Sequence, residues 1–104
     1  MNLIHIDPLM DFDPTLDLRN PGEVLLNDHL RPRLIPLARL ARRTGISLTT
    51  LRQITLGHRR INAEYALRLS CVVDPTPAYW LVLQARYDLA VASGTWPDGW
   101  FPRL

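Results

Sequence analysis

The side chains best suited to bind a polyanion are concentrated in the middle of the chain. Residues 31–60 hold eight arginines and no acidic residue, whereas residues 1–30 hold six acidic residues and one arginine. The net charge of +2 therefore hides a central block of +8. Arginine can donate two parallel hydrogen bonds to a phosphate or to guanine, and such a block is typical of nucleic-acid-binding surfaces. A solvated helix face is the alternative interpretation.

Other kinds of chemistry are not supported by residue spacing. The histidines show no metal-ligand spacing. Asp11, Asp13 and Asp17 suggest a calcium loop, but Leu16 and Gly22 stand where such a loop has its glycine and its glutamate. Neither a Ser/His/Asp set nor a pair of carboxylates is evident. We therefore expect no metal, no cofactor and no enzymatic activity.

The composition indicates a single domain in a reducing compartment. A chain of 104 residues that is 47% hydrophobic can bury one core. Its lone cysteine, Cys71, cannot form an internal disulfide, and its apolar neighbours indicate a small core residue on a helix. The chain start lacks signal-peptide features, and no apolar run approaches the roughly 18 residues of a membrane span. We expect a cytoplasmic protein that does not bind a membrane.

Capping residues and apolar periodicity predict an all-α fold of five helices. An acidic, apolar arm (residues 1–19) precedes the domain (residues 20–91), and a tail (residues 92–104) follows it. The expected helices cover about residues 21–30, 37–43, 48–56, 63–73 and 77–92, with N-caps at Asn20, Ser47, Asn62 and Thr76 and helix ends at Gly45 and Gly57.

The second and third expected helices have the features of a DNA-reading pair. In the third helix, Leu51 and Ile54 share one face and the polar residues occupy the other. Ala41 is small enough for the two helices to cross closely, and Gly45 permits the tight turn between them. These features predict a helix-turn-helix over about residues 37–56, whose second helix enters the major groove. A Leu-rich helical hairpin is the alternative.

Thr49, Arg52 and Gln53 lie on the outward face of the third helix and are the predicted base-reading residues. Arginine can pair with guanine O6 and N7, glutamine with adenine N6 and N7, and the threonine methyl group can contact thymine. For Thr49, an ordinary surface position is the alternative. Polar side chains around the pair are expected to contact the DNA backbone, namely Arg42, Arg43, Ser47, Thr50, His58, Arg59 and Arg60.

The fifth expected helix has apolar residues around more of its circumference than one core face requires. A dimer interface is one explanation, and burial at the centre of a small bundle is the other. On the first explanation, the interface residues are Trp80, Leu81, Leu83 and Tyr87.

The helix pair and three further segments carry a family resemblance. The segments "NPGEVLL", "INAEYALRLS" and "PAYWLVLQARYDL" (residues 20–26, 61–70 and 77–89) resemble the HigA-type, VapI-like antitoxins of type II toxin-antitoxin systems. That family is a branch of the Xre/Cro-C1-type, lambda-repressor-like helix-turn-helix regulators. The resemblance implies a homodimer that represses its own operon at a palindromic DNA operator. It also implies a protein partner, a HigB-type toxin, which is a RelE-like mRNA-cleaving ribonuclease.

Two sets of residues carry most of that resemblance. The less specific set is the helix start at Pro21, Gly22 and Glu23. The most specific lies in the fifth helix and consists of Trp80, Leu81, Leu83, Gln84, Tyr87, Asp88 and Leu89.

The chain departs from the family pattern in three places. Family members usually have Gly-Leu-Ser-Gln at residues 34–37, where this chain has Leu-Ile-Pro-Leu. Loss of the serine cap is expected to cost about 1 kcal/mol, offset in part if Pro36 begins the helix. Arg60 replaces a usual glycine. The long arm is the third departure, and it either packs on its own domain or clasps the toxin or the other protomer.

Two further functions remain open. A stand-alone transcriptional regulator would share every DNA-binding feature but have no toxin partner. A protein-interaction module would instead use the arginine block to hold an acidic protein.

Overall fold

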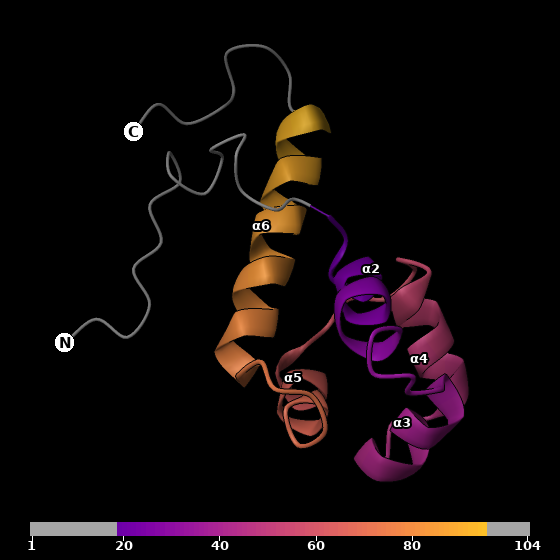
Figure 1. The fold of residues 1–104 in the computed structure, drawn as a ribbon. Coiled ribbons are helices and arrows are strands. Elements are labelled where there is room, and N and C mark those ends of the chain that lie inside the picture. The colour runs from indigo at the N-terminus through magenta and orange to yellow at the C-terminus, as the bar shows by residue number, and fades with distance from the viewer. Residues whose placement is uncertain (1–18, 96–104) are drawn as a thin grey trace, which may run out of the picture.

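The computed structural model describes residues 19–95, and every regular element in that range is helical (Figure 1). This confirms the predicted all-α fold. The predictions for residues 1–18 and for the tail beyond residue 95 lie outside the described residues. The elements are α2 (Pro21–Val24), which continues directly into the π-helical segment η1 (Leu25–Leu30), then α3 (Leu37–Thr44), α4 (Leu48–Thr55), α5 (Ala63–Leu69) and α6 (Pro77–Thr95).

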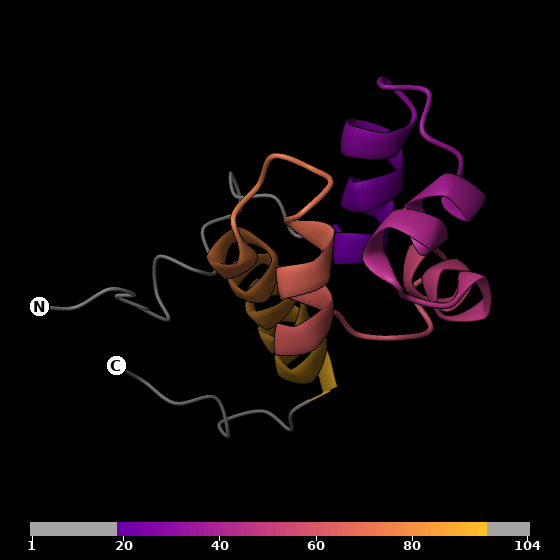
Figure 2. The same ribbon diagram turned by 90° about the horizontal axis from the view of Figure 1, so that it is seen from below.

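The continuous helix formed by α2 and η1 occupies the centre of the bundle. Its α2 part packs against both α4 and α6, while α3 packs on α4 and α5 packs on α6. Figures 1 and 2 show the consequence: α3 and α4 stand together on one side of the molecule, and α6 stands on the opposite side. The helix pair is therefore carried on a scaffold that leaves its outer surface uncovered by the other described helices.

Apolar residues from all the helices meet in one core. Leu51 and Ile54, the predicted inward residues of α4, are fully buried, as is Leu40 of α3. Burying one such side chain stabilises the fold by about 1.5–3 kcal/mol relative to leaving it exposed. The helix pair is therefore attached to the scaffold mainly through this face. The buried apolar residues are Val24, Leu25, Leu30, Leu40, Ile46, Leu51, Ile54, Ile61, Ala66, Leu69, Val73, Trp80 and Leu83.

Two of the four predicted dimer-interface residues belong to this core. Trp80 is fully buried and Leu83 is 5% exposed, so neither offers surface to a partner. The prediction is wrong for these two, because α6 packs on both α2 and α5 within the same chain. Burial inside a small bundle, the alternative explanation, accounts for them. Leu81 and Tyr87 are half-buried and stay candidates.

The predicted caps and glycines mark the helix ends in the structure. Side-chain oxygens of Asn20, Ser47 and Asn62 each accept a backbone N–H of the following helix, at 2.8, 3.1 and 2.8 Å. Gly45 and Gly57 have φ values of 75° and 80°, the left-handed conformation in which a side chain is strained. The turn on either side of α4 is therefore specified locally.

Two helix boundaries differ from the prediction by more than one residue. The N–H groups of Cys71 and Val72 bond to carbonyls three residues back, so α5 ends at Leu69 and the chain turns instead of continuing as a helix. Cys71 is consequently exposed, and its prediction as a core residue is wrong. Helix α6 runs through Thr95 and includes residues that we assigned to the tail.

Gly22 allows α2 to lie directly on the backbone of α4. A Cβ atom at this position would stand 1.7 Å from the carbonyl oxygen of Ile54 and 2.5 Å from its carbonyl carbon. Both distances are far below van der Waals contact, and neither atom belongs to a side chain that could move aside. The glycine therefore determines how closely the scaffold approaches α4.

The connection between η1 and α3 contains a strained residue. Leu34 has a φ of 55° and is the one non-glycine residue with positive φ in the described part of the chain. Its side chain is 83% exposed. Leu34 occupies the position at which the resembling family usually has glycine, which adopts this conformation without steric cost. The glycine of the family pattern thus has a backbone role, and this chain carries strain in its place.

Replacing Leu34 with glycine is expected to raise the free energy of unfolding by about 0.5–1 kcal/mol. Relief of the left-handed strain is worth roughly 1–2 kcal/mol, and the greater freedom of glycine in the unfolded chain subtracts about 0.4–1 kcal/mol. Urea unfolding measures the gain as a higher midpoint at unchanged slope. Leu34→Ala is the matched control, because it keeps the Cβ atom and the strain. An equal gain in both variants would assign the effect to the exposed side chain instead.

Candidate nucleic-acid interface

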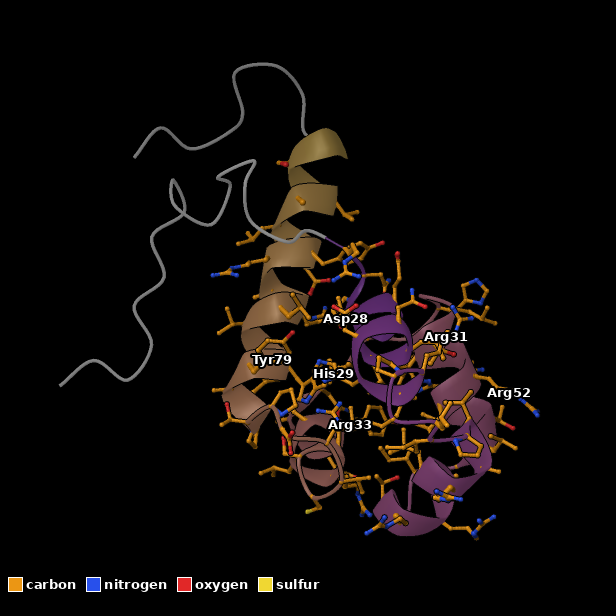
Figure 3. The ribbon with its side chains drawn as sticks, viewed as in Figure 1. Asp28, His29, Arg31, Arg33, Arg52 and Tyr79 are labelled. Carbon is orange, nitrogen blue, oxygen red and sulfur yellow. The ribbon has the colours of Figure 1, made fainter. Side chains whose placement is uncertain are left out.

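The polar face of α4 is open to solvent. Thr49 and Arg52 are exposed and Gln53 is half-buried, while Leu51 and Ile54 on the opposite face are fully buried. Figure 3 shows the Arg52 side chain extending outward from α4, on the side of the molecule away from α6. The three predicted base-reading residues thus share one accessible surface, which we name the reading face.

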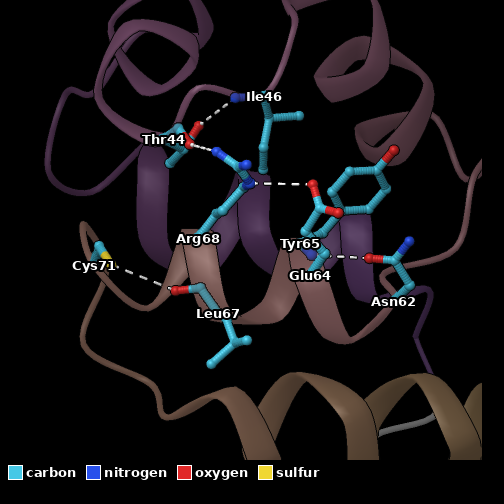
Figure 4. A network of polar contacts seen from close by, with 8 residues as sticks. All are labelled: Thr44, Ile46, Asn62, Glu64, Tyr65, Leu67, Arg68 and Cys71. Atoms are coloured by element: carbon cyan, nitrogen blue, oxygen red, sulfur yellow. Dashed lines mark hydrogen bonds and ion pairs between the residues drawn. The ribbon is translucent and has the colours of Figure 1, made fainter.

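The turn between α3 and α4 is closed by polar contacts that come partly from α5 (Figure 4). The Thr44 hydroxyl donates to the Leu40 carbonyl at 2.7 Å and accepts the N–H of Ile46 at 3.2 Å. Arg68 donates from Nη1 to the Thr44 carbonyl at 2.9 Å and from Nε to Glu64 at 3.2 Å. The carbonyl end of α3 is therefore bound by a cation, and the turn is held from outside the pair.

Sequence reasoning missed the roles of Thr44 and Arg68. A threonine in the last turn of a helix can bond back to a carbonyl one turn earlier, so Thr44 carried a local signal. The four-residue spacing of Glu64 and Arg68 signals an ion pair on one helix face. Nothing local signals the contact of Arg68 with a carbonyl 24 residues away.

Ser47 and Thr50, both predicted to contact the DNA backbone, hydrogen-bond to each other. The Ser47 hydroxyl accepts the N–H of Thr50 at 3.1 Å and donates to the Thr50 hydroxyl oxygen at 2.9 Å. The Ser47 hydroxyl hydrogen is therefore used inside the first turn of α4. Within the described residues, the Thr50 hydroxyl hydrogen has no such acceptor and is the better placed of the two to bond a phosphate.

Two arginines of the central block are held by acidic residues of the chain itself. Arg33 Nη2 lies 3.0 Å from Asp74 Oδ2, and Arg60 Nη2 lies 2.6 Å from Oδ2 of Asp88 in α6. Both pairs are largely open to solvent, so each is worth only about 0–1 kcal/mol. Their effect on charge is larger, because Asp88 offsets the positive charge of Arg60, a predicted backbone contact.

Four arginines of the block have no side-chain partner within the described residues. Three of them are on α3 and one is on the reading face, and all four are exposed. They are Arg39, Arg42, Arg43 and Arg52. Arg39 was missed by sequence reasoning, although it lies one helical turn before Arg42 and Arg43 and therefore on the same side of α3. The arginines without a side-chain partner therefore lie mainly on α3.

The loop after α4 is anchored to α6. The backbone N–H of Ile61 donates to Gln84 Oε1 at 2.8 Å, and Gln84 Nε2 donates to Asp88 Oδ1 at 3.0 Å. Gln84 is 4% exposed, so this bond is made out of contact with water. Gln84 and Asp88 belong to the segment that carried the most specific part of the family resemblance. Their contacts give that segment a physical role, which is to hold the loop behind the reading face.

Gln53 and Arg59, predicted to contact bases and backbone respectively, contact each other. Arg59 Nε donates to Gln53 Oε1 at 2.7 Å. The N–H of His58 also donates to the carbonyl of Gln53, at 2.8 Å. The loop is therefore joined to α4 at Gln53 through both its backbone and its side chain.

His29 lies where η1 meets α6, away from Arg52 (Figure 3). Its ring packs edge-on against Tyr79 and Trp80, with centroid distances of 6.1 and 5.3 Å. Burial, with a smaller contribution from the nearby Arg33, lowers the pKa of His29 below its ordinary value. The ring is therefore neutral near pH 7 and adds no charge to the interface.

The described residues contain neither a metal-binding cluster nor a membrane-spanning helix. Histidine, cysteine and acidic side chains do not gather there in groups of three or more that could hold a metal. None of the described helices has the length and hydropathy needed to cross a membrane.

The geometry defines a helix-turn-helix. A short helix, a tight turn closed by left-handed Gly45 and a second helix with a buried apolar face make up the pair. The second helix presents polar side chains at the molecular surface, which is the arrangement that allows a helix to enter a groove of DNA.

Comparison with known proteins agrees with this class. No protein-family model matches the chain. Over 68 residues it is 37% identical to an uncharacterized helix-turn-helix-type transcriptional regulator of Haemophilus influenzae, covering 65% of this chain and 64% of that protein. The solved structure of Pseudomonas aeruginosa antitoxin HigA with the higBA promoter matches with a TM-score of 0.71 and 35% identity, covering 75% of this chain and 85% of the other. Antitoxin GraA matches with a TM-score of 0.75 and 34% identity, covering 86% and 99%.

This chain belongs to the HigA-like family of helix-turn-helix antitoxins, which confirms the resemblance seen in the sequence. The match spans less than two thirds of the length of the Haemophilus regulator.

Proposed function

We propose that the chain is an antitoxin that binds operator DNA and represses its own operon. The observation that carries the proposal is the reading face, with Thr49, Arg52 and Gln53 accessible on α4. This helix packs against α3, whose three arginines have no side-chain partner within the described residues. The HigA structure described with promoter DNA, at 35% identity, supports DNA binding by this chain.

The two helices of the pair would have different tasks. Helix α4 has one cation, Arg52, and would enter the major groove and discriminate between bases. Helix α3 has three cations with no side-chain partner in the described part of the chain, and these would bind phosphates and supply affinity without regard to sequence. Of the predicted backbone contacts, Arg42, Arg43 and His58 are exposed and have no side-chain partner within the described residues, and Thr50 has its hydroxyl hydrogen left for this role.

Arg52→Ala and Gln53→Ala are each expected to weaken binding to a footprinted operator by about 1–3 kcal/mol and to relax the preference at one base position. The reason is that each side chain can pair with a base edge. Fluorescence anisotropy with single-base operator variants measures both effects. Arg42→Ala is the control: it should weaken binding to all duplexes alike and lower the salt slope by about one. If neither α4 variant changes the footprint, α4 is not the reading helix.

Repression at a palindromic operator requires two copies with their α4 helices about 34 Å apart. We propose that the homodimer forms through α6. Leu89 and Val91, in its C-terminal half, are 38% and 50% exposed and leave apolar surface uncovered by the described residues. Together with half-buried Leu81 and Tyr87, they are the candidates that replace the buried Trp80 and Leu83.

The partner to be silenced would be a HigB-type, RelE-like ribonuclease in the cytoplasm. The antitoxin names of the solved relatives support this part of the proposal. Co-expression with the product of the adjacent reading frame tests it, because an antitoxin restores growth that its toxin arrests. Operator binding without growth rescue would favour a stand-alone regulator. The name of the Haemophilus relative, a transcriptional regulator, supports the same alternative. Failure to bind any duplex at low salt would favour a protein-interaction module.

A further inference from the structure

The hydrogen bond between Arg59 and Gln53 fixes the orientation of a base-reading amide. A guanidinium group has only donors, so the atom that faces Arg59 Nε at 2.7 Å must be the amide oxygen of Gln53. The amide nitrogen Nε2 is therefore turned away from Arg59. This orientation follows from the chemistry of the two groups and not from a choice between similar atoms.

Arg59 is held in position by the residues on either side of it. The N–H of His58 donates to the Gln53 carbonyl at 2.8 Å, and Arg60 pairs with Asp88 of α6 at 2.6 Å. When both neighbours of a residue are already held by a hydrogen bond or an ion pair, the residue loses little additional backbone entropy as its side chain makes a contact. Arg59 is therefore prepared to hold Gln53 before any ligand arrives.

We propose that Arg59 is a positioning residue that makes Gln53 select guanine. This inference rests on the proposed DNA binding by α4. A glutamine reads adenine by accepting from N6 with its oxygen and donating to N7 with its nitrogen. Here the oxygen of Gln53 already accepts from Arg59, and the cationic guanidinium beside it repels the partly positive N6 amino group. The oxygen keeps a second lone pair, but a donor bonding to it would lie beside the guanidinium, so the donors on Gln53 Nε2 and on the Arg59 Nη atoms are the favoured groups at a base edge.

Guanine is the base whose major-groove edge matches such a pair. It presents two acceptors, N7 and O6, whereas adenine presents one acceptor and one donor. The pair of Gln53 and Arg59 thus acts as one reading unit with guanine as its target, in place of the adenine expected for glutamine alone. It also gives Arg59 a role distinct from the phosphate contact predicted from the sequence.

The test uses the full chain and a library of random-sequence DNA duplexes, with sequencing of the bound fraction. The position that loses its preference in Gln53→Ala is, by definition, the one that Gln53 reads. The wild-type chain is expected to favour guanine there by at least about fivefold over adenine, and Arg59→Ala is expected to shift that preference toward adenine. Arg42→Ala is the matched control, expected to retain the base preference and to lose affinity for every duplex.

Three results would overturn the inference. A wild-type preference for adenine at this position would contradict it directly. An Arg59→Ala variant with unchanged base preference, a uniformly weaker affinity and a salt slope lower by about one would make Arg59 a phosphate contact. If the folded wild-type chain selects no duplex at all, the proposed function fails and the inference falls with it. Arg59 is exposed, so thermal melting of the variant should match wild type, which separates these results from loss of fold.

Discussion

Replacing Gly22 with alanine is expected to lower the free energy of unfolding by about 3 kcal/mol or more. The added Cβ atom would meet the carbonyl oxygen of Ile54 at 1.7 Å and the Cα atom of Thr55 at 3.0 Å. Because these are backbone atoms of α4, relief requires the two helices to move apart. That movement would open the core around Leu51 and Ile54.

Urea unfolding followed by circular dichroism measures this loss, and Glu23→Ala is the matched control. Glu23 is the next residue of α2 and is exposed, so its truncation should change the free energy of unfolding by no more than about 0.5 kcal/mol. A Gly22→Ala variant with the wild-type midpoint would show that α2 and α4 are not in close contact.

Gln84→Met is expected to destabilise the domain by about 1–3 kcal/mol, because it leaves a buried N–H group without a partner. Methionine is similar in size to glutamine, but its thioether sulfur is only a weak acceptor and does not replace the amide oxygen Gln84 Oε1, which lies 2.8 Å from Ile61 N. The loop between α4 and α5 would then lose its buried attachment to α6 and keep only the exposed Arg60–Asp88 pair. Amide hydrogen exchange at Ile61 should accelerate along with the fall in unfolding midpoint.

Asp88→Asn is the control for this second substitution. It keeps an oxygen that can accept from Gln84 Nε2, and it removes only the exposed ion pair with Arg60. The expected change in unfolding free energy is within about 1 kcal/mol, and exchange at Ile61 should stay slow. Normal exchange at Ile61 in Gln84→Met would mean that another group satisfies this N–H.

The parts of the fold that sequence reasoning predicted are those decided by neighbouring residues. A serine cap at Ser47, a left-handed glycine at Gly45 and the apolar face formed by Leu51 and Ile54 each follow from local backbone and side-chain chemistry. They were sufficient to place the helix pair and to predict which side of α4 faces solvent. Which bases that side contacts stays a prediction.

The errors for Trp80, Leu83 and Arg60 concern contacts between residues far apart in the chain. An apolar residue on a helix gives the same sequence pattern whether the same chain or a second copy covers it. This is why the pattern predicted Trp80 at a dimer interface. The free charge of the central arginine block was overestimated for a similar reason. Arg60 pairs with Asp88, and this pairing depends on how the loop between α4 and α5 folds. Leu34 was noticed as a departure from a family pattern, but its strain became visible only with its φ angle.

The central place of α2 has a consequence for any attempt to dissect this protein. A peptide of residues 37–56 would carry every residue of the reading face, yet it would expose Leu40, Leu51 and Ile54, which are fully buried in the intact chain. Two eight-residue helices are too short to be stable in isolation. The smallest fragment that keeps α4 in shape must therefore include α2 and the part of α6 that bears Gln84, so the pair cannot be transplanted as a free-standing module.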